Sequence, residues 1–147
     1  MTKTIWVLDG PNLNFLGIRE PEVYGNRSYQ DLKDTLQAYC ANKNIALVHR
    51  QSNHEGQLVD WIQEAYYQKA DGLILNAGAY THTSIALYDA LMAIGIACVE
   101  VHLSDPKKRE DFRKTSYLSS ACVKTISGLG FESYLKAIDF LYERSSV

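Results

Sequence analysis

The sequence predicts an α/β fold, a flavodoxin-like doubly wound sheet of five parallel strands with helices on both faces. Two observations support this prediction. Short apolar runs alternate along the chain with segments whose apolar residues recur at helical spacing. The runs in the middle of the chain are apolar throughout, as in strands that are buried on both faces of a sheet. Right-handed crossovers then leave few topologies, and the doubly wound sheet is the simplest of them.

The chain is expected to form a single catalytic domain over residues 1–147. This length suffices to bury a hydrophobic core. No repeat, linker or low-complexity tract interrupts the sequence. The elements can therefore be taken in order as parts of one unit.

A long irregular loop separates the first strand from the first helix. The first strand is predicted at residues 4–9, and residues 9–25 follow without regular periodicity. A connection of this length in a compact domain is usually functional or disordered. Five apolar side chains could anchor it, namely Leu13, Phe15, Leu16, Ile18 and Val23. We therefore interpret residues 9–25 as an active-site loop with a mobile tip rather than as a disordered segment.

Capping residues and apolar stripes indicate four helices. Ser28 and Asp31 resemble a capping box that begins a helix running to about Lys43. Thr83 or Ser84 is expected to cap the third helix. The apolar stripes of the four helices are Leu32, Leu36, Tyr39 and Cys40; Leu58, Val59, Ile62, Ala65 and Tyr66; Leu87, Ala90, Leu91 and Ile94; and Tyr134, Leu135, Ile138 and Leu141.

The other four strands are short apolar runs between these helices. They are predicted at residues 45–51, 72–75, 96–101 and 121–126. A polar turn is expected at residues 52–56, after the second strand. Strand and helix thus alternate, as a parallel sheet requires.

Composition and charge exclude several classes of protein. The net charge is −2, so no broad basic surface points to nucleic acid. Three cysteines without a CxxC motif argue against a disulfide framework or a zinc knuckle. No apolar run reaches the roughly 20 residues of a membrane span, and no signal peptide is visible. The sequence therefore predicts a soluble cytoplasmic protein with neither nucleic acid nor a membrane as a partner.

Polar side chains gather where the predicted strands end. They are Asn12, Asn14, Arg19 and Tyr24 after the first strand, Asn53, His54 and Glu55 after the second, Asn76, Thr81 and His82 after the third, and Glu100, His102 and Ser104 at the fourth. In open α/β sheets, ligands bind outside the carboxyl ends of the strands. These side chains are therefore the candidates for a functional site.

Each of these side chains has a structural interpretation when it is taken alone. A single loop histidine is more often solvated or capping than functional, and Asp89 is expected on a solvated helix face. A zinc site has little support because no HxH or HExxH spacing occurs. The nucleotide-binding and serine-nucleophile motifs are also missing from the sequence. We therefore expect no metal and no cofactor.

The remaining set suits acid–base chemistry on a small, oxygenated, anionic substrate. Tyrosine ordinarily ionises near pKa 10, but a nearby guanidinium lowers this pKa. Arg19 lies five residues before Tyr24 in the same loop. His102 can donate or accept a proton near pH 7. The residues alone thus predict an acid–base enzyme, and a non-catalytic module that binds a small ligand on the same fold is the alternative.

Six segments carry a resemblance to a known family. They are GPNLNFLGIREPEVYG at 10–25, QSNHEG at 51–56, NAGAYTHTS at 76–84, VEVHLS at 99–104, REDFRKTS at 109–116 and ISGLGFESYLKAI at 126–138. In this order they resemble the type II 3-dehydroquinate dehydratases over nearly the whole chain. The resemblance implies reversible dehydration of 3-dehydroquinate to 3-dehydroshikimate through an enolate, without a cofactor, in the shikimate pathway or in quinate catabolism. It also implies a homo-dodecamer built as a tetramer of trimers.

The resemblance assigns the proton transfers to four residues. Tyr24 would remove a proton from C2, beside the ketone of the substrate. Arg19, with help from Arg113, would hold Tyr24 as tyrosinate. Asn12 would orient a water that hydrogen-bonds the developing enolate. His102 would protonate the departing C1 hydroxyl.

The resemblance also assigns residues that bind the substrate. Asn76 would fix the ring, and His82 with Arg113 would bind ring hydroxyls. Leu103 and Ser104 would offer backbone amides, and Ser104 its hydroxyl, to the substrate carboxylate. These roles make the substrate a small anion held by neutral donors and one guanidinium.

Two further roles concern residues outside the substrate's immediate contacts. Glu100 would support His102, and Asp89 would reach the site of a neighbouring subunit, which replaces the solvated-face interpretation. Residues 19–25 would form a lid that is displaced without ligand. The sequence departs from the family pattern at Asp9, where Asn is usual, at Ala77, where Pro is common, and at residues 106–108 and 114–115, but at none of the proposed proton-transfer residues.

Overall fold

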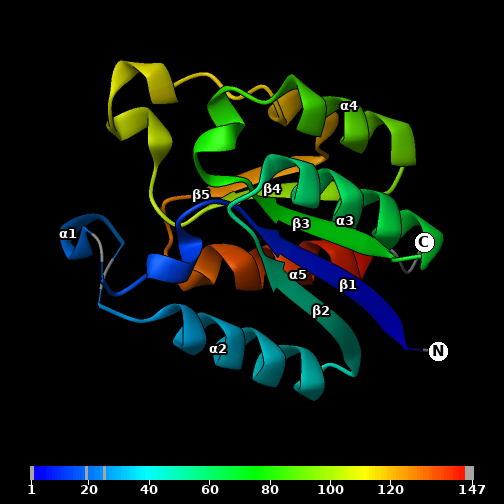
Figure 1. Cartoon of the computed structure of the whole chain (residues 1–147). Helices are drawn as coiled ribbons and strands as arrows, with labels where there is room; N and C mark the ends of the chain where they lie inside the picture. Colours follow the sequence, from blue (N-terminus) through cyan, green and yellow to red (C-terminus); the bar gives the residue numbers. More distant parts are fainter. Residues whose placement is uncertain (1, 19, 25, 145–147) are drawn as a thin grey trace.

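Five parallel strands form the centre of the computed structural model, which describes residues 2–18, 20–24 and 26–144 (Figure 1). The strands are β1 (Lys3–Asp9), β2 (Ile45–Gln51), β3 (Gly72–Asn76), β4 (Cys98–His102) and β5 (Lys124–Ser127). Their order in the sheet is β2-β1-β3-β4-β5, and every neighbouring pair is parallel. This is the predicted flavodoxin-like topology, which places all five carboxyl ends at one edge.

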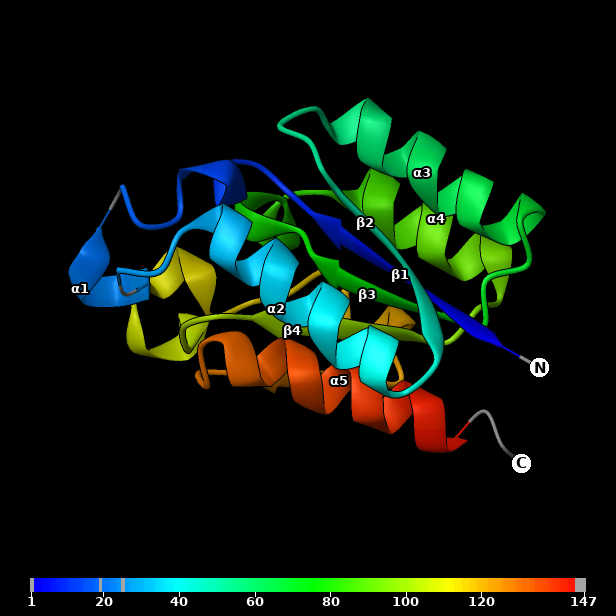
Figure 2. The same cartoon turned by 90° about the horizontal axis from the view of Figure 1, so that it is seen from below.

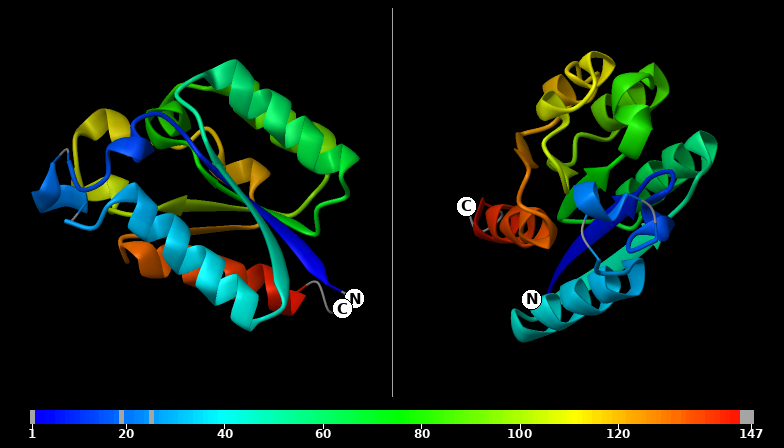
Figure 3. Two further views of the ribbon diagram at one scale, coloured as in Figure 1. Left: turned by 60° about the horizontal axis from the view of Figure 1, so that its bottom comes forward. Right: turned by 90° about the vertical axis from the view of Figure 1, so that its left-hand side faces the viewer.

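Four long helices cover the sheet on both faces (Figure 2). On one face lie α2 (Tyr29–Asn42) and α5 (Phe131–Arg144), and on the other lie α3 (Glu55–Tyr67) and α4 (Ile85–Ile94). Each face has its own buried apolar cluster, because alternate side chains of β1, β3 and β4 point to opposite sides. Figure 3 shows the two helix layers with the sheet between them. No helix in the described residues is long and apolar enough to span a membrane.

The predicted helix caps have the expected geometry. The Ser28 hydroxyl accepts a hydrogen bond from the Asp31 amide at 3.0 Å, and the Asp31 carboxylate accepts one from the Ser28 amide at 2.9 Å. This capping box begins α2. Ser84, not Thr83, caps α4, since its hydroxyl accepts from the Leu87 amide at 3.0 Å.

Three predicted boundaries were wrong by two or three residues. The turn at 52–56 already contains the first residues of α3, which begins at Glu55. Strand β4 begins at Cys98 rather than at residue 96. Strand β5 begins at Lys124, because residues 119–121 form a 3₁₀ turn, η5. The apolar side chains at the start of that run pack against the α3 and α4 cluster without joining the sheet, so hydrophobicity alone misplaced the strand.

The long loop after β1 contains two short helical turns. They are η1 (Leu13–Phe15) and α1 (Pro21–Tyr24), which project beyond the carboxyl edge of the sheet (Figure 1). Leu13 and Leu16 are buried in the cluster under α2 and α5, as predicted. Phe15 and Ile18 are exposed, so those two predicted anchors were wrong. The first half of the loop is therefore held against the core by two leucines.

Candidate active site

A cavity opens at the carboxyl ends of β1, β3 and β4. Its lining includes seven of the eleven predicted site residues, which are Asn12, Asn76, His82, His102, Leu103, Ser104 and Arg113. The segment between β4 and β5, with η3 (Pro106–Lys108) and η4 (Asp111–Arg113), closes one side of it. An adjoining hollow shares His82, His102 and Arg113 and adds Glu100. The topology thus brings together side chains that are up to about a hundred residues apart in the sequence.

The floor of the cavity is fixed by close backbone packing. The Gly10 amide donates to the Asn76 carbonyl at 2.7 Å. A Cβ on Gly10 would lie 2.5 Å from the Ala77 carbonyl oxygen, so only glycine fits there. Asn12 follows with a φ of 70°, in the left-handed region that Asn tolerates better than most residues. Its amide donates to the Asn53 side-chain oxygen at 3.0 Å, which holds Asn12 at the cavity wall.

Asn76 ends β3 and has both ends of its side-chain amide engaged. Its Nδ2 donates to the Tyr134 hydroxyl at 2.8 Å. Its Oδ1 accepts from the Gly78 amide at 3.3 Å. Asn76 is only 4% exposed, so a small part of its surface faces the cavity. The side chain is held in one orientation before any ligand binds.

His102 and Glu100 form a buried pair at the end of β4. The His102 Nε2 lies 2.5 Å from the Glu100 carboxylate. Because a carboxylate only accepts, Nε2 carries the proton and Nδ1 is the nitrogen left for exchange. Ser116, Ser119 and Thr125 also donate hydroxyl protons to Glu100. The pair therefore fixes the orientation of the imidazole.

The pKa of Glu100 reflects two opposing influences. Burial by itself raises this pKa, whereas the hydrogen bond and charge of His102 and the hydroxyls of Ser119 and Ser116 lower it. The net result is a pKa below the ordinary value. Glu100 is therefore a carboxylate at neutral pH, and it can stabilise positive charge on the ring beside it.

His82 and Arg113 also line the cavity. The His82 Nδ1 lies 2.7 Å from the Thr115 carbonyl, so Nδ1 is the protonated nitrogen and Nε2 remains to contact a ligand. The Arg113 Nε donates to Glu110 at 2.8 Å, and its guanidinium lies over the Phe112 ring. These contacts restrict two side chains of the cavity lining.

Leu103 and Ser104 continue β4 into the cavity wall. Their carbonyls accept from the Gly130 and Gly128 amides at 3.0 and 3.1 Å. The turn after β5 thus fixes the backbone of both residues. A backbone fixed in this way can present amide groups to an anion at little entropic cost.

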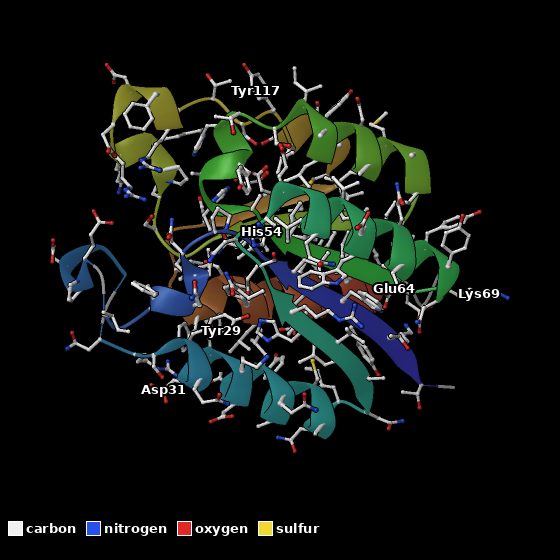
Figure 4. All side chains as sticks on the ribbon, in the orientation of Figure 1. Tyr29, Asp31, His54, Glu64, Lys69 and Tyr117 are labelled. Carbon is white, nitrogen blue, oxygen red and sulfur yellow. The ribbon has the colours of Figure 1, made fainter. Side chains whose placement is uncertain are left out.

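The other predicted residues have different positions. Asp89 is exposed on α4 and does not line the cavity of its own chain. Arg19 lies outside the described residues, and Tyr24 is described only as the last residue of α1, without its side chain. His54 occupies the N-cap position of α3 without a capping hydrogen bond from its side chain, and it is exposed (Figure 4), in agreement with the solvated interpretation of a single histidine.

Sequence reasoning missed Arg109, which also lines the cavity. Its guanidinium lies 3.8 Å from the carboxylate of Glu20, the residue between Arg19 and α1. The available signal was its spacing, because Arg109 and Arg113 are four residues apart in the REDFRKTS segment. This contact places the end of the long loop at the mouth of the cavity.

The described residues contain no group of three or more His, Cys, Asp or Glu side chains that could hold a metal ion. His102 supplies an acid–base group, and the asparagines and the backbone supply neutral donors.

Comparison with known proteins identifies the family. Residues 3–142 match the family described as Dehydroquinase class II. The chain belongs to this family. A relative from Acidovorax ebreus (strain TPSY), named 3-dehydroquinate dehydratase, is 52% identical over 145 residues, which cover 96% of this chain and 98% of the relative.

Solved structures support the same family. The type II dehydroquinase from Butyrivibrio crossotus DSM 2876 is 47% identical and superposes with a TM-score of 0.95, covering 96% of this chain and 98% of that chain. The type II dehydroquinase from Propionibacterium acnes is 36% identical with a TM-score of 0.91, covering 100% and 99% of the two chains. The class II dehydroquinase fold is thus shared over essentially the full length.

Proposed function

We propose that this chain dehydrates 3-dehydroquinate to 3-dehydroshikimate with Tyr24 as the base and His102 as the acid. Membership of the class II dehydroquinases and the names of the relatives make the chain a hydro-lyase of the shikimate pathway. The same reaction also occurs in quinate catabolism. The observation that carries the residue assignment is the buried His102–Glu100 pair, whose histidine lines a cavity together with six other candidate residues.

The first step in this proposal is the removal of a proton from C2 of the substrate. Tyr24, as tyrosinate, takes the proton, and the electron pair moves toward the ketone to give an enolate. Arg19 and Arg113 stabilise the tyrosinate, and Asn12 orients a water toward the enolate oxygen. The Arg109–Glu20 contact supports this arrangement, because it holds the residue next to Arg19 beside the cavity.

The second step is the loss of the C1 hydroxyl. The enolate electrons return to form the C1–C2 double bond, and the C1–O bond breaks. His102 gives its proton to the departing hydroxyl, which leaves as water. Glu100 stabilises the protonated His102 until that moment. The proton balance is completed when the proton on Tyr24 returns to solvent and His102 is protonated again.

The remaining assignments concern binding. Asn76 fixes the ring, and His82 and Arg113 contact ring hydroxyls. Leu103 and Ser104 bind the carboxylate. The fixed backbone of these two residues and the single orientation of the Asn76 amide support the assignments. Residues 19–25 act as a lid over the bound substrate.

The assembly and the location of the protein complete the proposal. The chain forms a dodecamer, as a tetramer of trimers, in the cytoplasm, and Asp89 reaches the site of a neighbouring subunit. The exposure of Asp89 on α4, outside the cavity of its own chain, supports a role between subunits. The reaction needs no metal or organic cofactor in this scheme.

The direct test follows the conjugated enone of 3-dehydroshikimate by ultraviolet absorbance after 3-dehydroquinate is added to the purified protein. We expect turnover in buffer that contains a metal chelator. Substrate binding without turnover would instead support the non-catalytic binding module.

The role of Tyr24 is tested by Tyr24→Phe. Loss of the base is expected to reduce kcat by at least about 100-fold, since general base catalysis typically contributes that much or more. Tyr67→Phe on α3 is the matched control, because Tyr67 is 79% exposed and does not line the cavity. If Tyr24→Phe kept the kcat of the control, Tyr24 would not be the base.

A further inference from the structure

A buried polar cluster lies directly behind the cavity and is not used in the proposed proton transfers. At its centre is Asp9, the last residue of β1, whose side chain is fully buried. Three groups approach its carboxylate. The Tyr134 hydroxyl lies 2.6 Å from Oδ1, whereas His49 Nε2 and the Tyr29 hydroxyl lie 2.6 and 3.0 Å from Oδ2. Burying an acidic side chain is costly unless such donors compensate it.

The cluster is assembled from both the sheet and the helices that cover one face. Asp9 is paired with Asn76 in the register of β1 and β3. Tyr134 reaches them from α5, and Tyr29 points from α2 toward the sheet (Figure 4). The cluster therefore joins a cavity residue to the core of the protein.

The direction of each hydrogen bond follows from the chemistry of the partners. An ionised carboxylate only accepts, so the single hydroxyl proton of Tyr134 points to Asp9. The Tyr134 oxygen can then only accept from Asn76. This forces the Asn76 amide to turn its NH₂ group to Tyr134 and its oxygen to the Gly78 amide. The carboxylate at position 9 thus selects one of the two possible flips of the Asn76 amide.

His49 and Tyr29 hydrogen-bond the other oxygen of the Asp9 carboxylate, Oδ2, and do not bond to Asn76. His49 Nε2 must also donate to Asp9, and its buried Nδ1 has no hydrogen-bond partner among the described residues. Tyr29 shares Oδ2 with His49. The hydrogen bonds to Oδ2 therefore do not involve Tyr134, and Tyr134 donates to Oδ1 alone.

We propose that Tyr134, held by Asp9, is a positioning residue that fixes the side-chain amide of Asn76 for substrate binding. The inference rests on the proposed role of Asn76 in holding the substrate ring. Tyr134 itself does not line the cavity and contacts no substrate. It acts through Asn76, so it affects binding of the substrate more than the chemical steps.

Tyr134→Phe tests this role. The variant leaves the Asn76 NH₂ group without its buried acceptor, and the amide can then rotate. We expect KM for 3-dehydroquinate to rise about 5- to 30-fold, as for the loss of a hydrogen bond that leaves a buried donor unpaired, with a smaller change in kcat.

Tyr29→Phe is the matched control. It removes another hydroxyl proton from the same buried carboxylate, but that hydroxyl has no link to Asn76. It is expected to lower the thermal unfolding temperature while KM stays within about 2-fold of the wild type. An equal rise of KM in both variants would overturn the proposal, because it would indicate a general loss of stability.

A double-mutant cycle with Asn76→Ala separates positioning from structure. In the Asn76→Ala background, Tyr134→Phe is expected to cause no further rise of KM, since no amide remains to be positioned. Additive effects on KM would overturn the proposal, and so would an unchanged KM in Asn76→Ala. Lack of turnover in the wild type would instead refute the proposed function, so the two failures are distinguishable.

A neutron structure of the wild type provides a second test that needs no variant to fold. Deuterium on the Tyr134 oxygen is expected to point to Asp9, and an ND₂ group of Asn76 to face Tyr134. An amide oxygen of Asn76 facing Tyr134 would overturn the proposal.

Discussion

At the scale of single residues, the Glu100 carboxylate links the chemistry of the site to the stability of the fold. It accepts hydrogen bonds from His102 and from hydroxyls of the segment after β4. Burial raises its pKa, but these partners lower it overall, so the folded protein favours the ionised form. The Glu100 carboxylate therefore both orients His102 in the site and holds the segment after β4 in place.

The lowered pKa predicts how Glu100 contributes to stability as the pH changes. A folded-state pKa below the unfolded value gives a stabilisation that is fully present above the unfolded pKa, near 4.5, and is lost as the pH falls through the folded pKa. Glu100→Gln should therefore reduce the free energy of unfolding by about 1–3 kcal/mol at pH 7 and by less at pH 3. Urea unfolding at both pH values measures the difference, and an equal loss at both would contradict it.

Residue types predicted much of this site, but not the contacts behind it. His102 and Asn76 were predicted because chemistry-bearing side chains at strand ends converge in a parallel sheet, whereas Arg113 was predicted only from the family resemblance. Tyr134 was predicted only as a member of the apolar stripe of α5. Its ring does pack in that core, but its hydroxyl bonds to Asp9, and no spacing along the chain reveals that pairing.

At the scale of elements, the join between β1 and the long loop determines the shape of the cavity. The chain leaves β1 at Gly10 and passes against the start of η2 (Gly78–His82). The sequence predicted the strand, the loop and the two leucine anchors, because apolar patterning is local. It could not predict the boundaries of β5, since burial against another layer and pairing in a sheet produce the same apolar run.

The close approach at Gly10 predicts a severe effect of Gly10→Ala. The added Cβ would lie 2.5 Å from the Ala77 carbonyl, so backbone must move at the cavity floor. We expect a loss of at least about 2 kcal/mol in the free energy of unfolding and a large drop in kcat/KM. Gly56→Ala in α3 is the control, because a Cβ there meets nothing within 4 Å. Equal stability of the two variants in thermal unfolding would refute the expectation.

At the scale of the whole molecule, the arrangement of layers explains why one chain gathers its site at one edge and leaves Asp89 outside it. The two helix layers bury both faces of the sheet, so the carboxyl edge is where loops from several strands meet. Helix α4 belongs to the layer opposite α2 and α5, and it carries Asp89 on its exposed side. We propose that Asp89, placed there, serves the site of another subunit.

This position leads to the prediction for the assembly. Light scattering of the wild type should give a mass twelve times that of the 16.6 kDa chain.

Asp89→Asn should lower kcat/KM by about 5-fold or more, the effect of a charged hydrogen bond, without altering the unfolding temperature. Glu64→Gln on α3 is the control, since Glu64 pairs with Arg50 away from the cavity. If a dilute monomer of the wild type kept full kcat/KM, Asp89 could not act across subunits, because each site would then be complete within one chain.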